Sequence, residues 1–239
     1  MAEAEALAGL MDQWSSQLLA PAQQVVSNDR LAIARAALAI ASHLDPQGRL
    51  MCFGAGHSWC LAAELCSRAG GLPGVVAMSL ADLGPKRDQW RQLADSGPER
   101  QVELAQPMID HHRLTSRDVL LVISNSGRNS MVIELARLAR AMGCLVVCVV
   151  SLAHANSIKS RHPSGQMLMD HADIVLDNHG SPGDAGVEVA PGVVSGATST
   201  IAGSLTLQLL ACCLAYHFSQ SESGFATIRS ANLDCEASQ

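Results

Sequence analysis

Three short segments of the 239-residue chain are rich in glycine, hydroxyl and amide groups, which together can hold an oxyanion. They are 54–58 (GAGHS), 124–130 (SNSGRNS) and 195–200 (SGATST). Glycine lets the backbone turn sharply and approach a ligand, and the start of a helix adds free N–H donors and positive potential. The middle segment, with three serines and two asparagines, is the strongest candidate for a phosphate site. It lacks the lysine of a P-loop, so a nucleoside triphosphate is not the expected ligand.

We predict phosphate contacts from the middle segment and further ligand contacts from the other two. The predicted phosphate-binding residues are Ser124, Asn125, Ser126, Gly127, Asn129 and Ser130. The predicted substrate-binding residues are Gly54, Gly56, Ser58, Thr198 and Ser199. Each segment also has a plainer interpretation, as a strand–helix turn or as the N-cap of a helix. Arg128 could supply charge to the ligand or simply be solvated.

Four side chains close to these segments could move protons: His57, Glu64, His179 and Asp184. Carboxylates and imidazoles near a neutral pKa suit general acid–base chemistry. His57 and Glu64 are seven residues apart, on one face of a predicted helix and roughly 10 Å apart along its axis. The other two lie in a Gly/Pro-rich loop. The alternatives are an ion pair of Glu64 with Arg68, a His57 ring that only packs or hydrogen-bonds a ligand, and a rigid surface turn around His179 and Asp184.

The scaffold that must position these residues alternates buried strands with helices. Strands are predicted at 49–53, 75–80, 118–124, 144–151 and 172–178. Helices are predicted at 3–19 and 22–43 with Pro21 between them, at 59–70, 101–112 and 131–143, and from Thr198 onward, with loops at 81–100 and 179–196. Apolar runs without alternation are typical of a parallel sheet covered on both faces, and such a sheet binds ligands at the carboxyl ends of its strands.

The composition excludes several classes of protein. The chain has a net charge of −6 and only 3% aromatic residues, so neither a basic face nor a stacking platform for nucleic acid is expected. Its 48% hydrophobic content does not fit a disordered chain. Because aromatic residues are scarce, ligand recognition should depend on a phosphate and on hydroxyl contacts from Ser, Asn, His and acidic groups.

Cysteine usage and the apolar segments bear on location. The eight cysteines form no C-x-x-C pair and have no zinc-ligand spacing, which favours a reducing compartment. The first residues lack the basic and apolar regions of a signal peptide. Residues 201–218 approach the length of a membrane span, but they contain polar residues and have no basic flank, so we predict a buried or interface helix.

The pairing of FGAGHS (53–58) with VISNSGRNS (122–130) resembles the SIS (sugar isomerase) domain, and SGATSTIAGSLTLQLL (195–210) looks like the helix that closes it. The outline is similar to phosphoheptose isomerases, in a branch with a GDA motif, here at 183–185. The resemblance implies that Ser124, Ser126 and Asn129 or Ser130 cradle a sugar phosphate, and that Ser58 faces the ligand. It implies Glu64 as the base, although its spacing from Ser58 is shorter than in those enzymes, and His179 as its partner.

We therefore expect an α/β protein with one doubly wound, flavodoxin-like five-stranded parallel sheet of SIS type and additional N-terminal helices. The expected organisation is N-terminal helices at 1–45, a phosphosugar-binding domain at 46–220 and a tail at 221–239. The expected function is aldose–ketose isomerisation of a sugar phosphate through an enediol; the alternatives are a phosphosugar lyase of etherase type and a non-catalytic sensor or regulator. We expect no cofactor, no metal, no nucleic acid and no membrane, a homodimer or homotetramer, and a cytoplasmic location.

Overall fold

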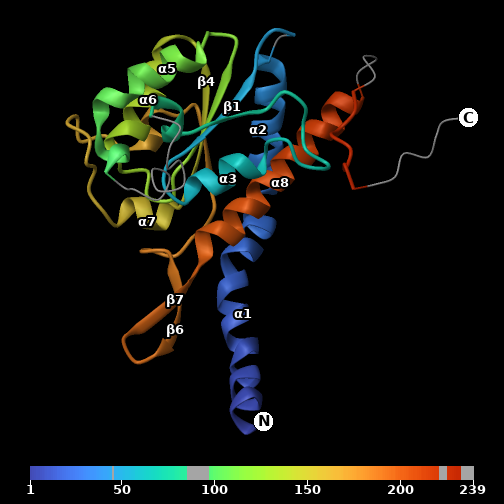
Figure 1. The fold of residues 1–239 in the computed structure, drawn as a ribbon, viewed down its shortest axis with the longest axis vertical. Helices are drawn as coiled ribbons and strands as arrows, with labels where there is room; N and C mark the ends of the chain where they lie inside the picture. The colour runs from blue at the N-terminus through green and yellow to red at the C-terminus, as the bar shows by residue number, and fades with distance from the viewer. Residues whose placement is uncertain (45, 85–96, 221–224, 233–239) are drawn as a thin grey trace, which may run out of the picture.

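Five aliphatic runs form the predicted parallel sheet in the computed structural model, which describes residues 1–44, 46–84, 97–220 and 225–232 (Figure 1). The strands are β1 (Leu50–Gly54), β2 (Val76–Met78), β3 (Val119–Ile123), β4 (Leu145–Val150), β5 (Ile174–Asp177), β6 (Ala185–Ala190) and β7 (Val193–Ala197). The helices are α1 (Ala2–Asn28), α2 (Arg30–His43), α3 (Ser58–Glu64), α5 (Ala105–His112), α6 (Ser130–Ala141), α7 (Leu152–Asn156) and α8 (Thr198–Ser219). Short 3₁₀ turns are η1 (Leu80–Leu83), η2 (Pro98–Arg100), η3 (Val102–Leu104) and η4 (Leu168–His171).

The strand order of the main sheet is β2-β1-β3-β4-β5, and every neighbouring pair is parallel. This is the flavodoxin-like order, so the predicted fold class is confirmed. After β1 the chain crosses to β2 on one side, and after β2 it returns to β3 on the other. The crevice at this change of direction lies outside the carboxyl ends of β1 and β3, where both Gly/Ser-rich loops begin.

Alternate residues of each strand face two separate layers of helices. Cys52, Leu121 and Val147 lie in one buried cluster with residues of α1, α2, α3 and α8. Phe53 and Val122 face the opposite side and pack with residues of α5 and α6. Because both faces are covered, the strands are apolar throughout, as the sequence indicated.

Helix α8 is long and apolar enough to cross a membrane by length and composition, with a mean hydropathy of 1.5. Core helices of soluble proteins pass the same test. Here Leu207, Leu210 and Leu214 are buried in the core, and α8 packs against α1 and α2. The helix serves as one wall of the domain.

Several predicted boundaries are wrong. Helix α1 continues through Pro21 and ends at Asn28, and its packing against α8 holds the turn in which Pro21 supplies no N–H donor. Helix α3 ends at Glu64, before the predicted stop at Gly70. The predicted loop at 179–196 contains the antiparallel β6–β7 hairpin. Of the predicted loop at 81–100, residues 85–96 lie outside the described residues, as do 221–224 and 233–239 of the tail.

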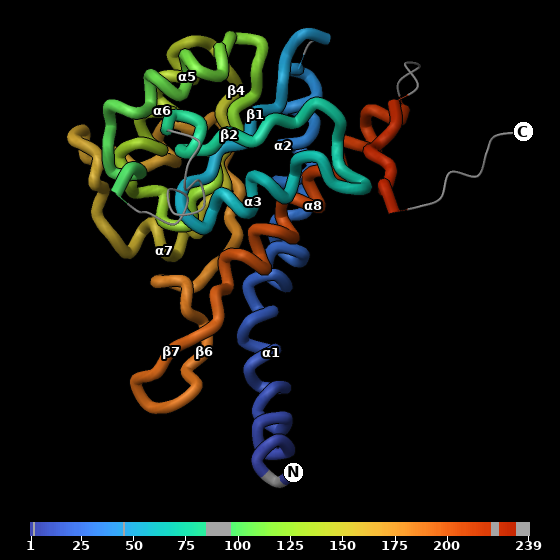
Figure 2. Tube along the Cα trace, viewed as in Figure 1, coloured from blue at the N-terminus to red at the C-terminus, as the bar shows by residue number. Residues whose placement is uncertain are grey.

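The first half of α1 and the β6–β7 hairpin extend from the same side of the domain (Figure 2). Leu18 of α1 packs over Gly196 of β7, where an added Cβ would lie 2.6 Å from the leucine Cδ2. Several apolar side chains on these two elements are exposed: Leu7, Leu10 and Met11 on α1, and Val193 and Val194 on the hairpin.

Candidate functional site

A pocket of ≈ 240 Å³ lies at the carboxyl ends of β1, β3 and β4. The three Gly/Ser-rich segments all contribute to it, although they are far apart in the sequence. The lining residues are Ala55, His57, Ser58, Leu61, Glu99, Ser124, Asn125, Ser126, Asn129, His154, Gly183, Asp184, Ser199 and Thr200. The site is therefore built from hydroxyl, amide, carboxylate and imidazole groups gathered at this edge of the sheet.

The loop between β3 and α6 forms the polar floor of the pocket. Ser124, Asn125, Ser126 and Asn129 line it. Asn129 is the N-cap of α6, and the first N–H groups of a helix have no partner within the helix. Gly127 does not line the pocket. It adopts φ +58°, and its N–H donates to the carbonyl of Ser124 at 3.1 Å, which gives the loop its tight turn.

Ser130 also lies outside the lining. Its hydroxyl donates to the carbonyl oxygen of Arg161 at 2.7 Å. Between the two residues that the sequence left open, Asn129 is the one that faces the pocket.

The loop after β1 supplies the opposite wall. A Cβ on Gly54 would lie 2.3 Å from the carbonyl oxygen of Ser58, so only glycine lets the first turn of α3 fold onto the strand end. Gly56 adopts φ +56° and lies beside the carboxylate of Glu99. Neither glycine lines the pocket, but they place Ser58 and His57, which do.

The start of α8 is held by Asp184, the residue immediately before β6. The carboxylate of Asp184 accepts hydrogen bonds from the backbone N–H and the hydroxyl of Ser199, both at 2.8 Å. Thr198 is fully buried, and its hydroxyl oxygen accepts the N–H of Ser181 at 2.9 Å. Asp184, Ser199 and the neighbouring Thr200 line the pocket, whereas Thr198 does not.

Glu64 and His179 lie outside the pocket lining of this chain. Glu64 forms an ion pair with Arg68 and accepts a hydrogen bond from Gln208 at 3.3 Å. The Nε2 of His179 contacts the carboxylate of Asp29 at 2.5 Å. The structure thus brings His57 and Asp184 to the pocket but separates the other two predicted acid–base residues from it.

The sequence analysis missed two titratable residues that line the pocket, Glu99 and His154. His154 lies just after β4, at a strand end where the ligand rule could have found it. Glu99 lies on η2 within a long polar stretch, and no sequence signal distinguishes it. Among the described residues, no group of three or more His, Cys, Asp or Glu side chains is placed to hold a metal ion.

His154 has a defined protonation state. Its Nδ1 accepts the backbone N–H of Gly183 at 3.0 Å, so the ring proton is on Nε2. Burial lowers the pKa of His154; the Asp184 carboxylate opposes this effect and the Arg128 guanidinium reinforces it, with a net decrease. At neutral pH the ring is a neutral hydrogen-bond donor.

The sequence profile of the SIS domain family matches residues 13–151. A UPF0309 protein of Halalkalibacterium halodurans is 36% identical over 188 residues, which cover 78% of this chain and 76% of the relative. A UPF0309 protein of Streptomyces avermitilis is 40% identical over 186 residues, covering 74% of this chain and 70% of the relative.

Solved structures share the fold at low identity. A proposed phosphosugar isomerase of Bacteroides fragilis, involved in capsule formation, has a TM-score of 0.56 at 20% identity over 91% of this chain and 95% of its own. The NanR protein of Vibrio vulnificus, solved in complex with ManNAc-6P, has a TM-score of 0.53 at 19% identity over 91% of this chain and 67% of its own. The fold, the profile and the relatives agree with the resemblance seen in the sequence: the chain belongs to the SIS domain family.

Proposed function

We propose that this protein isomerises a sugar phosphate between its aldose and ketose forms. The observation that carries the proposal is the composition of one pocket, in which the Ser/Asn loop at the start of α6 faces two carboxylates and two imidazoles. The loop suits a phosphate, and the other groups suit proton transfer. The complex of the structurally similar NanR protein with ManNAc-6P supports a phosphosugar ligand.

The chemistry requires a proton to move between two neighbouring carbons. A base removes the proton next to the carbonyl group of the open-chain sugar, which gives an enediol, and the proton then returns to the other carbon. A second group moves a proton between the two oxygens. Binding of the remote phosphate holds the reacting carbons in place, so that this energy contributes at the transition state.

Glu99 is the carboxylate best placed to act as the base. It lines the pocket, whereas Glu64, the base implied by the sequence resemblance, is ion-paired with Arg68 outside the lining. The other carboxylate of the pocket, Asp184, holds the start of α8 through two hydrogen bonds from Ser199, so it already has a structural role. The group that moves a proton between the two sugar oxygens would be an imidazole. His154 can donate from Nε2–H, and His57 is the second imidazole of the pocket.

The test is exchange of the carbon-bound proton with solvent. The protein is incubated in D₂O with pentose, hexose, heptose and amino-sugar phosphates, and deuterium incorporation and isomer formation are followed by NMR. Glu99→Gln is expected to lower exchange about a hundredfold or more while the ligand still binds. Glu64→Gln is the matched control and should retain exchange.

Other outcomes of this experiment would assign a different base or a different function. Loss of exchange in Glu64→Gln alone would restore Glu64 as the base. Release of a substituent from the sugar would favour a lyase, and binding without any exchange in the wild type would favour a sensor.

We also propose that two copies of this chain pair through α1 and the β6–β7 hairpin. Met11 is 58% exposed and Val194 is 62% exposed, next to other apolar side chains on the same two elements. Such a surface is typical of a protein interface. Met11→Glu should shift the mass measured by light scattering toward the monomer; an unchanged mass would exclude this surface as the interface.

A cytoplasmic location stays a prediction.

A further inference from the structure

Asn129 carries a hydrogen bond that fixes how its amide faces the pocket. Its Oδ1 accepts from Nη1 of Arg161 at 2.7 Å, and the Asn129 residue is only 7% exposed. An arginine side chain can only donate hydrogen bonds, so the atom that meets Arg161 must be the amide oxygen. The Nδ2 group is thereby left as the donor that Asn129 can offer to a ligand.

The orientation matters because an asparagine can present either end to the pocket. Turned the other way, Asn129 would place its carbonyl oxygen against an anion and repel it. The hydroxyls of Ser124 and Ser126 on the same loop can either donate or accept, whereas the amide oxygen can only accept and the amide nitrogen can only donate. A neighbour that only donates is therefore needed to make Asn129 an anion-binding residue.

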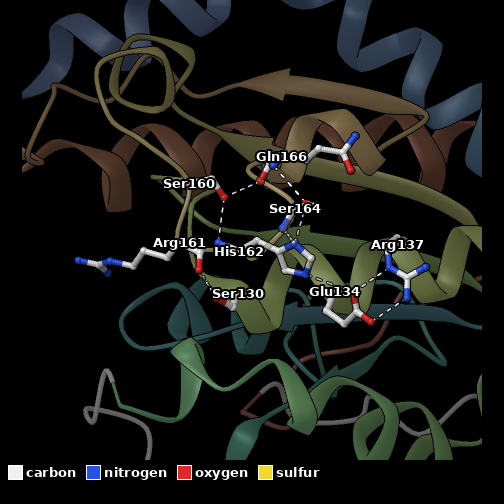
Figure 3. Close-up of polar contacts among 8 residues, drawn as sticks. All are labelled: Ser130, Glu134, Arg137, Ser160, Arg161, His162, Ser164 and Gln166. Carbon is white, nitrogen blue, oxygen red and sulfur yellow. Dashed lines mark hydrogen bonds and ion pairs between the residues drawn. The ribbon is translucent and has the colours of Figure 1, made fainter.

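The backbone of Arg161 is held firmly enough to serve this purpose. Its N–H donates to the carbonyl of Arg128 at 2.9 Å, and its carbonyl accepts the hydroxyl of Ser130 at 2.7 Å. The next residue, His162, contacts Ser164 through Nδ1 at 2.7 Å and Glu134 of α6 through Nε2 at 3.3 Å (Figure 3). These contacts tie the segment after α7 to the first turns of α6.

The charges around Arg161 also point to an anion. Burial lowers the pKa of Arg161, and repulsion from Arg128 and Arg100 lowers it further, against the attraction of Glu99. The Nε of Arg128 is buried with no hydrogen-bond partner among the described residues. A phosphate at the Asn129 end of the pocket would offset this repulsion between cations.

We propose that Arg161 is the positioning residue of the anion site: it orients the Asn129 amide so that the Nδ2 donor, and not the carbonyl oxygen, meets a phosphate monoester at the start of α6. This inference deepens the proposed function and rests on its placement of the phosphate. The site would therefore take dianionic phosphate esters in preference to the neutral sugars.

The test is a double-mutant cycle on the affinity for inorganic phosphate, measured by calorimetry on the full chain at constant ionic strength. Asn129→Ala and Arg161→Met should each weaken binding about tenfold, because each removes the oriented donor. If Arg161 acts through Asn129, the double variant should bind no more than about threefold more weakly than either single variant. Arg161→Lys, which can still donate to Oδ1, should retain most of the affinity.

Arg140→Met is the matched control, because Arg140 pairs with Asp173 near the far end of α6 and its loss changes the net charge equally. Its phosphate affinity should stay at the wild-type value. The inference is overturned if the wild type binds no phosphate, if Arg161→Met binds like the wild type, or if the single effects multiply. The double-mutant cycle measures phosphate affinity and needs no turnover of substrate. It can therefore support the role of Arg161 even if the protein is not an isomerase, and it can refute that role even if the protein is one.

Discussion

Replacement of Asp184 by alanine tests whether this residue holds the start of α8. The N-cap position of α8 is Ala197, which has no side chain able to cap the helix. Asp184 performs the capping from outside the helix, through two 2.8 Å bonds to Ser199. Asp184 also adopts φ +72°, a conformation that alanine disfavours.

The expected loss of stability has two parts. Loss of a capping side chain typically costs about 1–2 kcal/mol. A Cβ without a local polar partner at positive φ adds roughly 1 kcal/mol. For a chain of this size, a total of about 2–3 kcal/mol corresponds to a melting temperature lower by about 5–10 °C. Asp184→Asn keeps an acceptor and tolerates this backbone conformation, so it should melt within about 3 °C of the wild type.

Differential scanning calorimetry of the wild type and of the two Asp184 variants measures these melting temperatures. An alanine variant that melts with the wild type would refute the capping role. An asparagine variant of normal stability that has lost proton exchange would instead show that the carboxylate charge of Asp184 takes part in the chemistry, as the sequence analysis predicted.

Three further predictions concern the scaffold. Gly54→Ala should prevent native folding, seen as loss of a cooperative melting transition, because the added Cβ would overlap the backbone of Ser58; a stable variant would contradict this. Burial tends to raise the pKa of Asp118, but hydrogen bonds led by that from Arg49 outweigh it, and the net shift is downward. The stability that this shift contributes is present above the ordinary aspartate pKa. It is lost as the pH falls through the lower pKa of Asp118 in the folded protein. Asp118→Asn should therefore show a smaller fall in melting temperature on acidification than the wild type. The thiol of Cys148 is buried and its pKa is raised to about 12, so maleimide labelling followed by mass spectrometry should find it unmodified until the protein unfolds.

The sheet was predictable because its signal is local. Strands such as Val119–Ile123 are uninterrupted aliphatic runs, and the loops that follow β1 and β3 are rich in Gly, Ser and Asn. The hairpin was not, because most of its residues are exposed, and Pro191-Gly192 resembled ordinary loop composition. Pro21 indicated a break that packing against α8 overrides.

The pocket was predictable only in part. Residues on the strand-end loops, such as Ser126, follow from the topology rule. Glu99 reaches the pocket through η2, and its place depends on long-range packing that no local pattern encodes. Arg161 gains its relevance from one bond to Asn129, 32 residues away in the sequence.

The projecting half of α1 has a consequence for how stability is distributed along the chain. Residues 3–13 are exposed, whereas Ala22 and Val25 near the other end of the helix are buried in the core. Helical segments shorter than about 12–15 residues are marginal in water without tertiary contacts. Amide hydrogens at 3–13 of a lone copy should therefore exchange with solvent far faster than those near Val25, which open only when the domain unfolds. If a second copy covers this segment, its exchange should slow as the protein concentration rises, so one helix would report global unfolding at one end and assembly at the other.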